Sequence, residues 1–145
     1  MPPSPAYIRG VAPDSEIEQS IVVWVKAAQN HLAPLTGAVA GMEKALAAGA
    51  VGDDAPVAEV VVAIAGLLNW LGACEVPEPL RIAEGELRAA TGVYRNAASL
   101  FRSLPASDAA HQEAARLAAW SNALSQGDEH VERFYAEVRS HPSQA

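Results

Sequence analysis

Residues 81–104, RIAEGELRAATGVYRNAASLFRSL, carry the most regular pattern in the chain. Their apolar positions are spaced alternately by four and three residues, which is the period of an amphipathic α-helix. These positions are Ala83, Leu87, Ala90, Tyr94, Ala97, Phe101 and Leu104. Large and small side chains alternate along the stripe, so a neighbouring helix can approach closely at the alanines and interlock around the larger side chains. The stretch therefore predicts a helix that packs against another helix.

Three further segments have the same helical period, with apolar residues spaced by three or four over 21–46, 57–71 and 117–138. Four amphipathic helices joined by short connections bury their apolar faces most simply in a bundle. The sequence therefore predicts an all-α fold, an up-down-up-down four-helix bundle with a short Pro-rich N-terminal tail. The second helix is the shortest, so one end of the bundle should be covered by fewer than four helices. It is also the most apolar, so we expect it to be the most buried.

Two of the predicted helices contain residues that disturb a regular helix. Ser15 and Glu18 have the spacing of a capping box, so we expect the first helix to begin there. Pro34 falls inside this helix, but the apolar phase continues across it, which favours one helix kinked near the proline. Gly127 and Asp128 fall inside the fourth helix, and the sequence leaves open whether the helix is split there.

The chain is expected to form one folded domain with two short tails. Its 145 residues suffice for a single domain with a substantial core, but not for two domains of ordinary size. Three prolines among the first five residues favour an extended start. We therefore expect an extended or disordered tail over 1–13, one helical-bundle domain over 14–141 and a second tail over 142–145.

The overall composition is acidic, with a formal net charge of −7 and a pI near 5.0, which argues against attraction to nucleic acid or anionic membranes. Arginine outnumbers lysine and alanine is abundant, as is typical of GC-rich bacterial genomes. The N-terminus lacks the basic start and apolar run of a signal peptide. The longest uncharged apolar run, 60–74, is shorter than the roughly 20 residues of a membrane span. We therefore expect a soluble, cytoplasmic bacterial protein with no nucleic-acid partner and no membrane span.

Residues suited to catalysis or metal binding are few. Cys74 is the only cysteine, and it falls at the C-terminal end of a predicted helix, where the helix dipole disfavours a thiolate. Asp108 and His111 give one acid-x-x-His spacing, whereas a di-metal bundle needs two Glu-x-x-His motifs and further carboxylates. The sequence contains no nucleophile elbow, phosphate-binding glycine loop, dinucleotide fingerprint or zinc ligand set. We therefore expect no enzyme activity, no cofactor and no bound metal.

The tripeptide Trp70-Leu71-Gly72 resembles the Trp-x-Gly turn of the small type VII secretion substrates of the WXG100 kind. This three-residue resemblance implies a secreted helical protein. In that family the motif joins two long helices, and a Tyr-x-x-x-acidic signal follows the second. Here the tripeptide ends an apolar helix, and Tyr135 is followed four residues later by Arg139. A packed tryptophan and a helix-ending glycine are the alternative interpretation of the same residues.

Four arginines recur every seven residues along the most regular helix, and together they form one stripe beside its apolar face. They are Arg81, Arg88, Arg95 and Arg102. In an acidic chain this stripe is a local concentration of positive charge that suits an acidic partner helix or an anionic ligand. The alternative is a solvated flank whose arginines pair with acids such as Glu84, each pair contributing little to stability.

Two functional hypotheses follow from these patterns, in addition to the secretion-substrate resemblance. The first is a non-catalytic helical-bundle protein that acts by binding a partner protein or a second copy of itself. The second is a bundle that encloses a small apolar ligand in a cavity between its helices. The candidate lining residues of that cavity are Trp24, Trp70, Tyr94, Phe101, Trp120 and Phe134. A solid aromatic core is the alternative interpretation of these six side chains.

Overall fold

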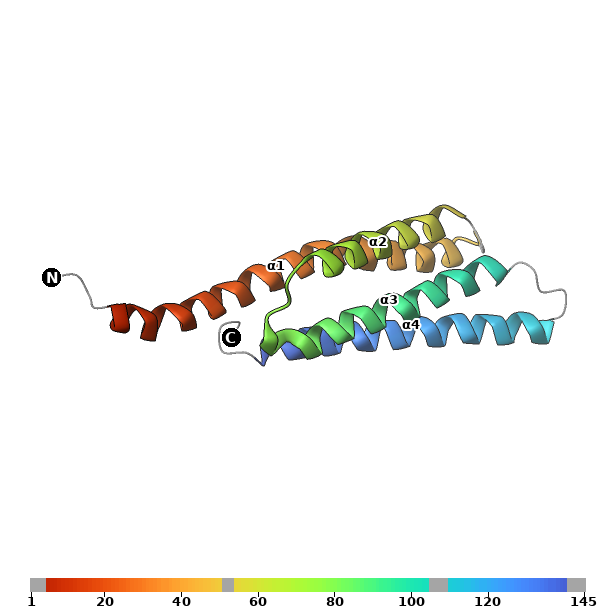
Figure 1. The fold of residues 1–145 in the computed structure, drawn as a ribbon. Coiled ribbons are helices and arrows are strands. Elements are labelled where there is room, and N and C mark those ends of the chain that lie inside the picture. The colour runs from red at the N-terminus through yellow and green to blue at the C-terminus, as the bar shows by residue number, and fades with distance from the viewer. Residues whose placement is uncertain (1–4, 51–53, 105–109, 141–145) are drawn as a thin grey trace.

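The computed structural model describes residues 5–50, 54–104 and 110–140, and the side chains of 16–50, 54–104 and 114–140. Its helices are α1 (Pro5–Ala47), α2 (Asp54–Ala73), the 3-10 helix η1 (Glu78–Leu80), α3 (Arg81–Ser103) and α4 (Ala110–Arg139). No strand occurs in these ranges. The four α-helices lie side by side, and Figure 1 shows each one running back along its predecessor. The predicted all-α four-helix bundle is therefore confirmed.

The helices form two hairpins, α1 with α2 and α3 with α4, which lie against each other (Figure 1). The backbones of α3 and α4 have the most extensive close approach. All seven residues of the stripe predicted for α3 are buried, from Ala83 to Leu104. On α4, Gly127 is buried and lies against the ring of Tyr94. Small residues on both helices therefore allow the close packing that the alternation on α3 predicts.

The apolar helix α2 is buried on one face only. Val60, Ile64 and Leu67 are in the core, whereas Val61 and Val62 are exposed, Val62 by 70%. The expectation that α2 would be the most buried helix is wrong, because it packs against α1 and α3 and its outer face has no described neighbour. Among the described helices, α2 alone is long and apolar enough to cross a membrane, a test that core helices of soluble proteins also pass. The expected absence of a membrane span stays a prediction.

The first helix begins earlier than its sequence suggests. α1 starts at Pro5, so 5–13, expected to be extended, are helical. Proline is tolerated there because the first-turn N–H has no partner within the helix. The Ser15–Glu18 pattern therefore lies inside α1 and does not mark its start. α1 continues through Pro34, and α4 continues across the Gly127-Asp128 pair, each as one helix. Residues 1–4 and 142–145 of the predicted tails lie outside the described residues.

The two ends of the bundle differ because α1 is much longer than α2. At 1.5 Å per residue the 43 residues of α1 span about 65 Å, against about 30 Å for the 20 residues of α2. α2 stops at Ala73, whereas the N-terminal part of α1 projects past that point (Figure 1). We call this the open end of the bundle. It agrees with the expectation that one end would be covered by fewer than four helices.

Candidate interaction surface at the open end

The open end is built where α2 stops and the chain crosses to α3. Cys74 still donates its backbone N–H to the carbonyl of Trp70 at 2.9 Å, which closes the last turn of α2. Pro77 has extended backbone angles, with φ −57° and ψ 138°, and it cannot donate to a helix. Leu80 then inserts fully into the core and fixes the start of α3. The connection is thus anchored at both of its ends, while 74–77 form one wall of a cleft.

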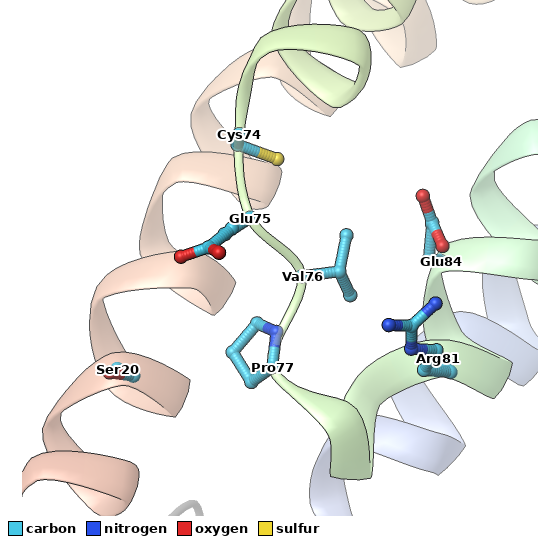
Figure 2. Close-up of a pocket in the computed structure, with 7 residues that line it drawn as sticks. All are labelled: Ser20, Cys74, Glu75, Val76, Pro77, Arg81 and Glu84. Atoms are coloured by element: carbon cyan, nitrogen blue, oxygen red, sulfur yellow. The ribbon is translucent and has the colours of Figure 1, made fainter.

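A cleft of about 540 Å³ lies between this connection, α1 and the first turns of α3. It is lined by Ser20, Cys74, Glu75, Val76, Pro77, Arg81 and Glu84 (Figure 2). In that view Cys74 and Val76 point toward the side of the cleft formed by α3, and Glu75 points toward α1. Two further clefts adjoin the same stretch of α1, of about 500 and 420 Å³. Their lining adds Glu16, Ile17, Gln19, Val23, Glu78 and Pro79.

Two exposed apolar side chains of α1 line these clefts. Ile17 is 49% exposed and Val23 64% exposed on α1, and both line a cleft. Val22 on α1 and Ile82 in the first turn of α3 are also exposed, but they line none of the three clefts. Of the described large apolar side chains that are exposed, four of seven belong to these two short stretches. Apolar groups gathered beside a cleft are typical of a binding surface, whereas scattered ones are not.

The charged groups around the clefts are mostly acidic. Glu78 accepts a hydrogen bond from Nε of Arg81 at 3.0 Å, within the same short stretch of chain. Glu84 is paired with a cation outside the clefts, the guanidinium of Arg88. Glu16 and Glu75 are exposed, and no cation among the described side chains lies within 4.0 Å of either carboxylate. The open end therefore presents apolar surface beside two carboxylates that no described cation neutralises.

The predicted arginine stripe is exposed along α3, but most of it is paired with nearby acids. The four residues are Arg81, Arg88, Arg95 and Arg102. The first two pair with glutamates three or four residues before them in sequence, and the last lies 3.5 Å from Asp54 on α2. Arg95 has no described carboxylate within 4.0 Å. The stripe thus carries much less uncompensated positive charge than its sequence suggests.

Five of the six aromatic candidates for a ligand cavity pack against another member of the set. Trp24 packs on Trp70 and Phe134, with ring centroids 5.4 and 6.2 Å apart. Phe101 packs on Trp120 at 5.7 Å. Five of the six are buried, and Trp70, half-buried, stacks on the ring of His31. Tyr94, which is buried, donates its hydroxyl hydrogen to Asp128 on α4.

The geometry around Cys74 offers no activated nucleophile among the described residues. Its Sγ lies 3.7 Å from the carbonyl oxygen of Leu71 in the preceding turn. The nearest described imidazole in sequence, His31, uses Nδ1 toward the carbonyl of Ala27 and stacks on Trp70. Within the described side chains there is no group of three or more His, Cys, Asp or Glu that could hold a metal ion. The Asp108–His111 spacing lies outside the described side chains.

The open end was not predicted as a site from the sequence, although the apolar residues of α1 contain part of the information. Val23 falls off the buried stripe of Ile21, Val25 and Ala28, whereas Ile17, four residues before Ile21, continues that stripe into a turn where it is exposed. Apolar residues off the core stripe of an amphipathic helix indicate a second apolar surface. The side of the site formed by 74–84 gives no such signal, because its approach to α1 depends on the tertiary fold.

No family model matches this chain, and the searches found no significantly similar curated protein and no significantly similar solved structure. The WXG100 resemblance therefore stays confined to Trp70-Leu71-Gly72. The structure places this tripeptide within the last turns of α2, and not in the connection between two helices.

Proposed function

We propose that this protein is a non-catalytic helical bundle that acts by binding a partner protein at the open end. The observation that carries the proposal is the coincidence of three features there: adjoining clefts, exposed apolar side chains and unpaired carboxylates. Burial of apolar surface supplies most of the affinity in protein association, and charge at the rim selects the partner. The open end provides both kinds of group on one surface.

The bundle contributes rigidity to this surface. Leu80 anchors one side of the clefts, and Ile21 and Val25 anchor the exposed turns of α1 to the core. A surface that is held in place before binding loses little conformational entropy when a partner docks.

Site-specific photo-crosslinking tests the proposal. A photo-reactive residue at Ser20 lies in the main cleft, and the same residue at exposed Ser99, near the far end of α3, is the matched control. In the cells that make the protein, irradiation of the Ser20 variant should give a discrete adduct that the Ser99 variant does not give. The captured protein, once purified, should bind the unmodified chain. An adduct of twice the chain's mass would identify the partner as a second copy.

The same crosslinking experiment can also contradict the proposal. If the Ser20 variant gives no discrete adduct, or if both variants give the same set of adducts, the open end is not a binding surface. A captured protein that fails to bind the unmodified chain in purified form would also contradict the proposal.

A further inference from the structure

We infer that the partner of the open end is a basic amphipathic segment, with apolar residues on one face and lysine or arginine on its flanks. This inference rests on the proposed function and names the chemical class of the partner. Among the described side chains, the lining of the three clefts holds four carboxylates and one guanidinium, that of Arg81, which is already paired with Glu78. The surface is therefore complementary to positive charge.

The two carboxylates that have no described cationic partner line different clefts of this surface. Glu16 is on α1, and Glu75 is in the connection after α2, where its side chain points toward α1 (Figure 2). Ser20, which has a small hydroxyl side chain, lines all three clefts and so connects the parts of the surface that hold the two carboxylates. A cation on each flank of a bound segment would meet a carboxylate, and the segment's apolar face would remain between them.

The apolar groups set the length of the segment. Ile17 and Val23 are separated by about 9 Å along α1, at 1.5 Å per residue. Pro77 and Pro79 border the same surface on the other side and have no backbone N–H to satisfy. About two turns of helix in the partner suffice to cover this distance, with apolar residues four positions apart in sequence.

An acidic partner is disfavoured at this surface because it would place like charges beside Glu16 and Glu75 without a free cation to offset them. The arginine stripe of a second copy is also disfavoured, since three of its four members are paired within their own chain. A basic segment from another protein is the occupant that meets the apolar and the charged groups together.

Two synthetic helical peptides of about 18 residues test the inference, each with leucine along one face. One peptide carries lysine on its flanks, and the other carries glutamate at the same positions. Binding to the full chain is measured by fluorescence anisotropy at low and at physiological salt. The lysine peptide should bind at least tenfold more tightly than the glutamate peptide, and its affinity should fall as salt rises. Equal binding of both peptides, or no binding of the lysine peptide, would overturn the inference.

Charge-removing variants locate the bound peptide. The double variant Glu16→Gln with Glu75→Gln keeps the shape of both side chains and should weaken the lysine peptide about fivefold, since exposed ion pairs contribute modestly. The control variant Glu43→Gln with Glu59→Gln removes two exposed carboxylates away from the open end, so the net charge is the same. The control should change affinity less than twofold. Equal weakening by both variants would show that only net charge matters, and would overturn the inference.

The double variant Ile17→Ser with Val23→Ser measures the contribution of the apolar side chains to peptide affinity. Both positions are exposed, so the fold should be unaffected. It should weaken the lysine peptide about tenfold at every salt concentration, and retained affinity would overturn the docking geometry. A crosslinked partner found at Ser20 together with failure of the lysine peptide would leave the proposed function standing and remove the inference about partner class. Failure of the crosslinking alone would remove the proposed function.

Discussion

Replacing Gly127 by alanine should destabilise the bundle, although the same change stabilises most helices. A Cβ atom at this position would lie 2.7 Å from both Cδ1 and Cζ of Tyr94, and closer still to Cε1. Real Cβ contacts are essentially never this short, so the ring must move. The ring is held by the core and by the hydrogen bond from its hydroxyl to Asp128. Movement of the ring therefore strains the packing of α3 on α4.

The magnitude follows from two opposed effects. Alanine gains about 0.5–1 kcal/mol over glycine within a helix. Forcing a methyl group into a packed interface costs about 1–3 kcal/mol, and weakening the part-buried hydrogen bond to the Asp128 carboxylate adds about 1–2 kcal/mol. The variant should therefore be less stable than the natural chain by about 1–4.5 kcal/mol. For a domain of this size that corresponds to a melting temperature lower by roughly 3–15 °C.

Urea unfolding followed by circular dichroism measures this difference, with Gly92→Ala as the matched control. Gly92 is exposed in the middle of α3, and a Cβ atom added to it would have no neighbour within 4 Å, so alanine there should stabilise by about 0.5–1 kcal/mol. In a Tyr94→Ala background the clash is gone, and Gly127→Ala should then become stabilising too. If Gly127→Ala stabilises the natural chain as much as Gly92→Ala does, α3 and α4 do not pack as closely as the contact between Gly127 and Tyr94 requires.

Three further predictions concern side-chain pairs. Burial raises the pKa of Tyr94 above its ordinary value. The protonated hydroxyl of Tyr94 therefore stabilises the fold below about pH 10, and this stabilisation is lost as the pH rises further. Tyr94→Phe should reduce that loss when denaturation is measured from about pH 8 to 11. Arg88→Ala breaks an exposed pair with Glu84 and should lower the unfolding free energy by less than about 1 kcal/mol; a larger loss would indicate buried pairing. His130 and Glu86, 2.7 Å apart and largely shielded, should show a coupling of about 1 kcal/mol in a double-mutant cycle, and additive effects would refute their interaction.

The packing of α3 was predictable because it depends on the spacing of apolar residues within this one segment of the sequence. Residues from Ala83 to Leu104 repeat by fours and threes, and the repeat alone determines which face is apolar. The exposure of the arginine stripe follows from the same geometry. The pairing of Arg88 with Glu84 is also local, four residues apart, whereas that of Arg102 with Asp54 requires knowledge of how α2 lies on α3.

The errors arise where tertiary context outweighs a local signal. Ser15 and Glu18 match a capping box, but the helix begins ten residues earlier, at Pro5. A capping box and a proline in the first turn are both common at helix starts, so the local sequence is compatible with either start. The exposure of Val62 could not be read from α2, because an apolar helix is buried only where neighbours cover it. The open end joins 16–23 to 74–84, and no short-range pattern connects those two stretches.

Binding of a partner at the open end should change the rate at which Cys74 reacts with a thiol reagent, because Cys74 lines the main cleft there. Cys74 is the only cysteine of the chain, is partly exposed and lines the main cleft, so the measured rate reports on that cleft alone. Saturation with the partner captured from Ser20 should slow the reaction about tenfold or more, because the bound segment covers the thiol. An unchanged rate at full saturation would place the partner elsewhere and contradict binding at the open end.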